Sequence, residues 1–376
     1  MDSIKDKCAI VGIGETAYSR DSGRTELSLA SEAIKNALDD AGLCPADIDG
    51  IVKYAVQFDT ESAVAACLGI PYLKYYGEVG PAGGAACGLV NHAVQAIVTR
   101  MATNVVVFRA MNGRSGLRYG RGEITGRAGR GSAAFTEPFG LVVPGQGYAL
   151  MARRHMHEYG TTSRQFGAVA VACRKHGSMN PRAILRNPIT IEEHQNSRVI
   201  YEPFHLLDCC IETDGACAVV ITSAERARVL RQRPAYIMAA VQAAMGAGEG
   251  RLALTETTAK YTAPMLFQMA GVTPKDIDVA QIYDHFTAMV IIALEDYGFC
   301  KKGEGGSFVE GGRIELGGEL PVNTAGGHLS EAYLHVMNHI AEAVRQLRGT
   351  STAQVDGTEL VLVDSTGGSG ALILRR

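Results

Sequence analysis

Several features are absent from this 376-residue sequence, and each absence excludes a class of protein. No apolar run approaches the roughly 18 residues of a membrane-spanning helix, so no contact with a membrane is expected. The opening MDSIKDKCAIVGIG lacks the apolar core of a secretory signal, which predicts a cytoplasmic protein. With 36 basic and 39 acidic residues, the chain lacks the excess positive charge that is typical of nucleic-acid-binding proteins.

The cysteines also lack a recognisable pattern. Nine of them are scattered along the chain, and no CxxC pair occurs. A structural zinc ribbon within this chain is therefore not expected, and no metal ligands are assigned. The odd count agrees with a reducing compartment.

What is present is the composition of a large globular protein. Apolar residues make up 47% of the chain and charged residues 20%. Glycine is abundant, at 44 residues, which indicates many tight turns and close backbone contacts. The length allows two domains or one large α/β body.

One nine-residue segment occurs twice. Residues 41–49 read AGLCPADID and residues 270–278 read AGVTPKDID, at an offset of 229 residues. In each copy a helical pattern ends at a glycine, a proline follows three residues later, and a short extended run comes next. We therefore predict a duplicated body with pseudo-twofold halves at 1–230 and 231–376 and a site where they meet. The first half would include an Arg/Gly-rich loop at 113–145 and a cap region at 146–210.

Short apolar runs alternate with helical patterns in both halves. Strands are predicted at 9–13, 51–56, 105–108, 217–222, 236–240, 279–283 and 360–363, and helices at 25–41, 87–100, 148–158, 163–175, 261–270 and 329–347. Buried strands that alternate with helices favour an α/β fold with helices on both faces of its sheets.

Two glycine-rich segments could contact a ligand. Residues 113–131 contain five arginines, and they form either a solvated loop or a loop that meets phosphates or an acidic partner surface. The turn GPAGGAACG at 80–88 runs into a helix, so the N–H groups near Gly83 and Gly84 could bind a phosphate or an oxyanion. Cys87 is either a nucleophile activated by this helix start or a small residue that packs the helix.

Polar residues also gather where two strands of the second half end. Tyr283, Asp284 and His285 lie at the end of one predicted strand, at the edge where α/β proteins bind ligands. The sequence DSTGGSG follows another, and its Ser365 and Gly367 form either a ligand-binding turn or an ordinary strand connection.

The segment LPVNTAGGHLSEAY at 320–333 opens a predicted helix with a polar, flexible turn. It supplies Asn323, Gly327 and His328, and Tyr333 would lie one turn into the helix. His335 and His339 lie four residues apart, which permits a metal pair, but without a glutamate between them a surface pair is the preferred interpretation.

These segments together resemble the thiolase superfamily over essentially the whole chain, and most closely the thiolase-like lipid-transfer proteins related to sterol carrier protein-X. LPVNTAGGHLSEAY is similar to the LPVNPSGG-LS-GHP segment of that superfamily, and YDHFT is similar to its NEAFA or HDCFS segment. DGACAVVITSAERA and DSTGGSGA also resemble family segments. The resemblance implies a duplicated, five-layered αβαβα sandwich that binds coenzyme A thioesters. It implies substrate contacts at Gly83, Gly84, His285, Asn323, Gly327, His328, Ser365 and Gly367.

Departures from the thiolase pattern carry the functional prediction. The nucleophilic cysteine of thiolases would align with residues 83–85, none of which is cysteine, and Cys87 lies later. The histidine of the GHP segment aligns with Tyr333, and the residue that opens the NEAFA-type segment aligns with Tyr283. Tyrosines at both places resemble the thiolase-like retro-aldolases of steroid side-chain breakdown, which cleave a β-hydroxyacyl-CoA to a ketone and a shorter acyl-CoA.

In such an aldolase one tyrosine would take the proton of the β-hydroxyl group, and the other would protonate the α-carbon. Tyr333 is assigned as the base and Tyr283 as the acid, and the reverse assignment stays open. One alternative is a CoA-dependent β-ketoacyl-CoA thiolase that uses Cys87, of the benzoylsuccinyl-CoA type. A second alternative is a lipid or acyl-CoA carrier without catalytic activity.

The resemblance also implies partners. It predicts a homodimer that binds a small protein with an OB-fold and a zinc ribbon, which gives a heterotetramer. Zinc would then belong to that partner, and this chain would need no cofactor beyond the coenzyme A thioester that is its substrate.

Overall fold

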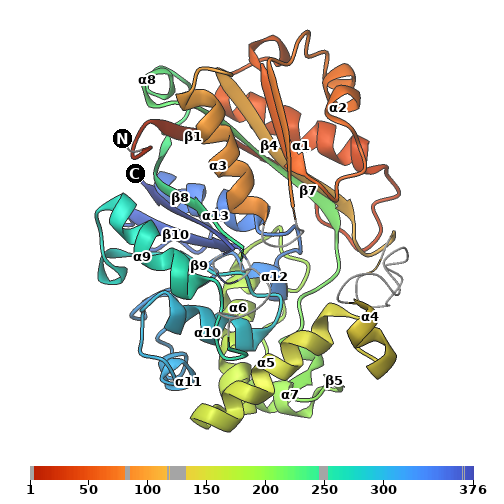
Figure 1. Ribbon diagram of the computed structural model, residues 1–376, viewed down its shortest axis with the longest axis vertical. Helices are drawn as coiled ribbons and strands as arrows, with labels where there is room; N and C mark the ends of the chain where they lie inside the picture. Colours follow the sequence, from red (N-terminus) through yellow and green to blue (C-terminus); the bar gives the residue numbers. More distant parts are fainter. Residues whose placement is uncertain are drawn as a thin grey trace.

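A computed structural model describes residues 4–80, 85–116, 118, 133–244, 253–365, 367 and 369–376 of the chain (Figure 1). In these residues the main sheet has nine strands in the order β3-β2-β4-β7-β1-β8-β11-β10-β9. The strands are β1 (Cys8–Glu15), β2 (Gly50–Tyr54), β3 (Tyr75–Val79), β4 (Asn104–Asn112), β7 (Asp214–Ser223), β8 (Ala235–Gln242), β9 (Val279–Gln281), β10 (Leu360–Ser365) and β11 (Gly370–Arg375).

The nine strands form two half-sheets of the same topology. In the first, β3, β2 and β4 are parallel, and β7 and β1 follow antiparallel. In the second, β9 and β10 are parallel, β11 and β8 follow antiparallel, and a parallel bridge between Ala280 and Val322 takes the place of β3. The half-sheets join where Ala9 and Ile10 of β1 pair with β8. The predicted duplication is therefore present in the fold.

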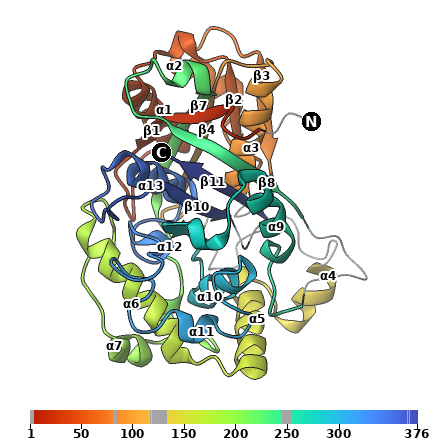
Figure 2. The same ribbon diagram turned by 90° about the vertical axis from the view of Figure 1, so that its left-hand side faces the viewer.

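Helices cover both faces of each half-sheet. They are α1 (Glu26–Ala41), α2 (Glu61–Leu68), α3 (Ala85–Val98), α4 (Ala133–Thr136), α5 (Pro144–Tyr159), α6 (Ser163–Met179), α7 (Ile191–Asn196), α8 (Ala224–Ala227), α9 (Ala259–Ala270), α10 (Thr287–Asp296), α11 (Gly305–Phe308), α12 (Gly327–Ser330) and α13 (Met337–Arg348). Figures 1 and 2 show α1, α2 and β4 above β8 and β10, with α5, α6 and α7 in the lower part of the molecule beside α10 and α11.

The side chains along each strand point alternately to the two faces of the sheet, and their contacts show the order of the helix and sheet layers. Along β4, Val106 joins the apolar core of α1, whereas Val105 and Val107 join the central core of α3 and α13. Along β10, Leu362 joins the core of α9 and α10, whereas Val361 faces the central helices. Because successive strand residues point to opposite faces, the order is helix, sheet, helices, sheet, helix. The predicted five-layered αβαβα fold is confirmed, and the boundary between residues 230 and 231 stays a prediction.

The repeated segment forms the same local structure twice. Helix α1 ends at Gly42 and α9 ends at Gly271, with φ of 74° and 70° in the left-handed region that glycine adopts without strain. Pro45 and Pro274 then each begin a 3₁₀ turn that leads into β2 and β9. The sequence pattern predicted both helix ends correctly.

One predicted helix is broken. Residues 329–347 do not form a single helix, because α12 ends at Ser330 and α13 begins at Met337. His335 and Val336 between them have φ of 49° and 75°, which a helix cannot continue through and which is unfavourable for a β-branched residue. Tyr333 therefore lies in the connection between the two helices and not one turn into a helix.

The region after β4 is only partly described. Residues 117 and 119–132 of the predicted Arg/Gly-rich loop lie outside the described residues. The remainder of 113–145 is not all loop, since it contains α4, a 3₁₀ turn (Glu137–Phe139) and the start of α5. Arg114 and Arg118 form ion pairs with Glu212 at 3.6 Å and 2.5 Å, so these two arginines face an acidic side chain of the same protein.

The predicted cap region at 146–210 holds most of α5, all of α6 and α7, and a small hairpin of β5 (Val199–Tyr201) and β6 (Phe204–His205). It packs on the second half, where α6 contacts α10 and α12. Among the described residues, no helix combines the length and the apolar character needed to cross a membrane.

Candidate active site

Two tyrosines meet in the second half of the molecule. The hydroxyl oxygens of Tyr283 and Tyr333 lie 2.7 Å apart, in a hydrogen bond that either can donate. Tyr283 follows β9, and the side-chain amide of Asn323 holds the main chain just before it through bonds of 2.8 Å and 2.9 Å to Ile282. Tyr333 is held by its N–H, which donates to Thr213 Oγ1 at 2.9 Å. The structure thus brings together the two tyrosines that the sequence singled out.

The two phenols differ in their environment. Tyr283 is only 3% exposed, and burial, together with the nearby Tyr333, raises the pKa of its hydroxyl well above 10. Tyr333 is half-buried. Tyr283 therefore keeps its proton at neutral pH, whereas Tyr333 is the more accessible of the pair.

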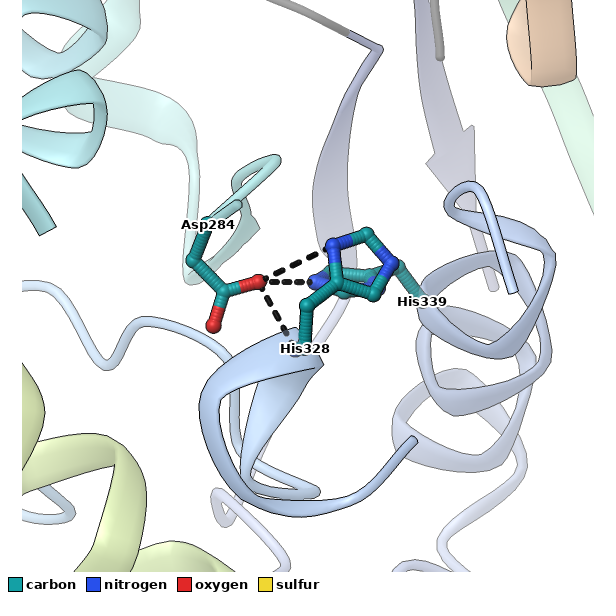
Figure 3. Close-up of side chains that lie close together, drawn as sticks. All are labelled: Asp284, His328 and His339. Carbon is teal, nitrogen blue, oxygen red and sulfur yellow. Dashed lines mark hydrogen bonds and ion pairs between the residues drawn. The ribbon is translucent and has the colours of Figure 1, made fainter. Parts of the chain in front are cut away.

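Asp284, the residue after Tyr283, forms a hydrogen-bond centre with the start of α12 and with His339 (Figure 3). Its carboxylate accepts the backbone N–H groups of His328 at 2.8 Å and Leu329 at 3.2 Å, at the start of α12. It also accepts Nε2–H of His339 at 3.1 Å. Gly327 is required beside it, because a Cβ atom there would lie 2.1 Å from Asp284 Oδ2. This carboxylate holds α12, and with it the connection that carries Tyr333.

The cluster of Asp284, His328 and His339 has the composition of a metal site, since its ligand atoms lie within 4.8 Å of one another. The hydrogen bonds argue against a metal. Nε2 of His328 accepts the N–H of Val336 at 3.1 Å, so a neutral His328 carries its proton on Nδ1. A protonated Nδ1 has no lone pair for a metal, and its 3.3 Å separation from Asp284 Oδ1 suits an attraction to the carboxylate.

His335 and His339 are not the surface pair that the sequence analysis preferred. Both are 1% exposed. The helix break turns them to different partners: His339 faces Asp284, and His335 accepts a hydrogen bond at Nδ1 from Nε of Arg109 at 3.3 Å. The prediction of a surface pair was wrong, because residues four apart share a face only within one continuous helix, and the helix is broken here.

Arg109 was missed by the sequence analysis. Its guanidinium is 3% exposed and donates to Gln57 Oε1 at 2.8 Å and to Ala110 O at 2.7 Å. Among the described residues no carboxylate forms an ion pair with it. A sequence signal existed, because an arginine inside the apolar strand NVVVFRAMN is rarely buried without a role.

His285 is buried next to Tyr283, with ring centroids 4.4 Å apart. The ring of Tyr148 from α5 packs edge-on against it at 4.1 Å. Burial lowers the pKa of His285 to about 3, so the imidazole is neutral at physiological pH. The backbone of Tyr283 raises this pKa slightly, but neither ring nitrogen makes a hydrogen bond of normal distance and angle in the described part of the chain.

The other predicted contact residues have mainly structural surroundings. Asn323 is fully buried, and its amide is occupied by the main chain of Ile282. Ser365 is buried and accepts the N–H of Cys87 at 3.2 Å. Gly367 has φ of 57°, and a Cβ atom there would lie 2.5 Å from Thr257. Gly83 and Gly84 lie outside the described residues.

Cys87 does not have the surroundings of a nucleophile. It lies inside α3, fully buried, and its Sγ lies 3.6 Å from the carbonyl oxygen of Val363. Burial raises the pKa of its thiol far above the usual range. This is opposite to the lowered pKa that a helix start could have provided.

Comparisons with known proteins show which family the chain belongs to. Residues 219–373 match the family model described as thiolase C-terminal domain-like. The chain is 49% identical to 17-hydroxy-3-oxo-4-pregnene-20-carboxyl-CoA lyase of Mycobacterium tuberculosis, over 98% of this chain and 97% of that protein. It is 48% identical to the steroid side-chain-cleaving aldolase of Thermomonospora curvata, over 98% and 97%. The solved structure of an Ltp2-ChsH2(DUF35) aldolase superposes with a TM-score of 0.93, at 46% identity over 100% of this chain and 99% of that chain.

A duplicated five-layered αβαβα fold defines a member of the thiolase superfamily. Within that superfamily, the chain belongs to the family of the thiolase-like aldolases named above, which are carbon–carbon lyases. The resemblance, the fold class and the lyase class predicted from the sequence are confirmed.

Proposed function

We propose that this protein cleaves the Cα–Cβ bond of a β-hydroxyacyl-CoA by a retro-aldol reaction, which releases a ketone and a shorter acyl-CoA. The hydrogen bond between the hydroxyls of Tyr283 and Tyr333 is the observation that carries the proposal. The relatives supply the substrate class, a steroid acyl-CoA such as the 17-hydroxy-3-oxo-4-pregnene-20-carboxyl-CoA in the name of one of them. In that molecule the 17-hydroxyl group is on the β-carbon.

The mechanism needs one base and one acid. The phenolate of Tyr333 takes the proton of the β-hydroxyl group, the C–O bond becomes the carbonyl of the ketone, and the Cα–Cβ electron pair moves into the thioester as an enolate. The phenol of Tyr283 then gives its proton to the α-carbon. One proton transfer along the 2.7 Å hydrogen bond restores both tyrosines.

The difference in burial supports this assignment of roles. Tyr283 holds its proton because burial raises the pKa of its hydroxyl, which suits an acid. Tyr333 is half-buried and can meet the substrate hydroxyl. The opposite assignment would require the more buried phenol to carry the negative charge in the resting enzyme, before the substrate reacts, which burial disfavours.

Arg109 supports a negative charge near Tyr333. Its buried guanidinium donates to Nδ1 of His335, whose ring centroid lies 4.9 Å from that of Tyr333. A buried cation without a paired carboxylate favours anions in its neighbourhood. The phenolate of Tyr333 and the thioester enolate are both anions that this charge would stabilise.

The state of Cys87 argues against the thiolase alternative. Thiolysis requires a thiolate within reach of the thioester, and the buried thiol of Cys87 keeps its proton. The carrier alternative gives no reason for two hydrogen-bonded phenols and a buried cation at one place. Retro-aldol cleavage uses all of these groups.

A homodimer is part of the proposal. Strand β3 is the outer edge of the first half-sheet, and its backbone is open to pairing. Tyr76 on this strand is 69% exposed, and Tyr72 and Phe58 are similarly exposed. Large aromatic side chains beside an open strand support pairing of β3 with β3 of a second copy, in the isologous manner of a twofold dimer.

A second apolar surface supports a different partner. Phe135 and Phe139, from α4 and the turn after it, are 79% and 83% exposed, and Val142 is exposed nearby. The structural relative is named as an Ltp2-ChsH2(DUF35) aldolase, which names two components. We infer that a small protein of that kind covers this surface, and the zinc ribbon and OB-fold expected from the sequence would belong to it.

Replacement of single hydroxyls tests the reaction. Tyr283→Phe and Tyr333→Phe should each lower the rate of ketone release from 17-hydroxy-3-oxo-4-pregnene-20-carboxyl-CoA at least about 10³-fold, because each removes one proton-transfer step. Cys87→Ala should retain cleavage, and wild-type cleavage should proceed without free coenzyme A. Full activity in both tyrosine variants would refute the mechanism. A requirement for free coenzyme A, together with loss of activity in Cys87→Ala, would establish the thiolase alternative instead.

A further inference from the structure

The unpartnered imidazole of His285 separates it from the other buried histidines. His155 bonds through both nitrogens, to Thr161 at 2.8 Å and Glu295 at 2.9 Å. His194 likewise bonds to Asp208 at 2.7 Å and Gln195 at 3.0 Å. His285 is 4% exposed, and both of its nitrogens lack a hydrogen-bond partner among the described residues.

Two unsatisfied polar atoms in one buried ring are unfavourable for folding. Each loses its hydration without a hydrogen bond in return, and native proteins leave few such groups without a reason. The backbone here is well ordered, since the carbonyl of His285 accepts the N–H of Cys210 at 3.0 Å. Tyr148 and Phe286 also pack edge-on against the ring. The fold therefore holds a polar ring at a fixed place, and the described residues do not supply its hydrogen bonds.

We propose that His285 is the residue that recognises the β-oxygen of the acyl group, the atom that is a hydroxyl in the substrate and a ketone carbonyl in the product. The inference rests on the proposed function, which places this oxygen at the tyrosine pair. His285 is two residues from Tyr283, and the two rings are in contact. Its role is specificity for the substrate oxygen, whereas the tyrosines transfer the protons.

A neutral imidazole has the right properties for both forms of this oxygen. One ring nitrogen accepts a hydrogen bond from a hydroxyl group, and the protonated nitrogen donates to a carbonyl oxygen. A site that satisfies such a bond discriminates strongly against an analogue without the oxygen, because that analogue leaves the buried polar group unpaired. The sequence places Val56, with no polar atom, at the corresponding position of the first repeat.

The test separates folding from recognition with His285→Phe. If the ring only served the fold, the variant would lose stability. Because it replaces two unsatisfied polar atoms with an apolar ring of similar shape, we expect unchanged or higher resistance to denaturant. His155→Phe is the matched control, since it breaks two buried hydrogen bonds and should lose stability.

Recognition is measured as binding in the Tyr333→Phe background, with any partner protein that co-purifies, so that the hydroxylated thioester is not consumed. The probes are 17-hydroxy-3-oxo-4-pregnene-20-carboxyl-CoA and the same thioester without its 17-hydroxyl group. With His285 present, the hydroxylated thioester should bind about 100-fold more tightly, and with His285→Phe the ratio should fall below about threefold. His285→Gln should restore part of the ratio, since it returns a donor and an acceptor.

Each outcome decides the proposal. An unchanged ratio in His285→Phe, an equal loss of affinity for both thioesters, or a strong loss of stability would overturn it. Failure of the proposed function has a different signature, because wild-type protein would then bind the thioesters without cleaving them. In that case the affinity ratio still reports whether His285 recognises the oxygen.

Discussion

Tyr54 and Tyr283 stand at equivalent places in the two repeats, and their hydroxyls do different things. The offset of 229 residues that relates the repeated segments also relates these two tyrosines. Tyr54 is fully buried at the end of β2, and its hydroxyl donates to the carbonyl of His335. The hydroxyl of Tyr283 meets the phenol of Tyr333. The same residue type thus supports the backbone in one repeat and meets the second phenol of the candidate site in the other.

The positions after these tyrosines extend the contrast. Ala55 and Val56 in the first repeat correspond to Asp284 and His285 in the second. Ala55 is exposed, whereas Asp284 is fully buried and accepts hydrogen bonds from α12. Duplication explains the shared scaffold, and the polar residues of the candidate site lie where the second repeat departs from the first.

The largest effect is expected from the two tyrosines themselves. Tyr283→Phe should lower cleavage at least about 10³-fold with little loss of stability, since the hydroxyl of the half-buried Tyr333 can bond to water instead. Tyr54→Phe should lower activity less than about tenfold and cost about 1–3 kcal/mol of stability, because it leaves the buried carbonyl of His335 without its donor. Steady-state kinetics and denaturant unfolding of both variants make the comparison. Equal losses of activity in the two variants would contradict the assignment of a structural role to Tyr54 and a catalytic role to Tyr283.

The residues after the two tyrosines, Asp284 and Ala55, should differ in how much they contribute to the stability of the protein. Asp284→Ala should destabilise the protein by about 3 kcal/mol, because it removes the acceptor for two backbone N–H groups and for His339. Ala55→Ser, at the equivalent exposed position, should change stability by less than about 0.5 kcal/mol. Equilibrium unfolding in urea measures both. A loss below about 1 kcal/mol in Asp284→Ala would contradict the role of this carboxylate in holding α12.

A pH effect should come from the connection between α12 and α13. Burial raises the pKa of Glu331 there from 4.5 to about 7. A carboxyl that binds its proton more tightly when folded loses stability as the pH rises from about 4.5 to about 7, by up to about 3 kcal/mol. Glu331→Gln should remove this loss, so its advantage over wild type should grow across that window and stay constant above it.

Denaturant unfolding at a series of pH values makes this measurement. Asn338 Nδ2 now donates to Glu331 Oε2 at 2.8 Å, and a half-turn of the Asn338 amide would let its Oδ1 accept the glutamine N–H instead. Parallel stability curves for wild type and Glu331→Gln between pH 4.5 and 7 would contradict the prediction.

The smallest effect concerns the charge that the first repeat contributes. Arg109 on β4 reaches His335 in the second repeat. If it supports an anionic base, Arg109→Met should shift the acid limb of the kcat/KM profile about one pH unit upward, and Arg109→Lys should return it toward the wild-type position. A merely structural arginine would change the rate or the stability without moving the limb.

The sequence predicted what depends on local chemistry. Helix ends at Gly42 and Gly271, the duplicated order of elements and the two tyrosines followed from turn residues, apolar periodicity and the family resemblance. These features could be predicted because they depend on short segments of sequence or on the order of helices and strands along the chain.

Other features depended on contacts between distant segments. The break before α13 requires positive φ at His335 and Val336, which no propensity scale predicts for a histidine and a valine. The same break turns His339 toward Asp284 and His335 toward Arg109, so the helical spacing was misleading. Cys87 was ambiguous because its burial, which raises its pKa, comes from packing against β10.

The hydroxyl of Tyr54 has a consequence for the protein as a whole. It belongs to the first repeat, and it stabilises a carbonyl in the left-handed turn of the second repeat that carries Tyr333. Cutting the chain between the repeats would separate this turn from its support, even though each fragment would keep its own strands. The second fragment alone would lose this hydrogen bond and the one from Arg109 to His335, so its activity should be lower than that of the whole chain and should rise when the two fragments associate.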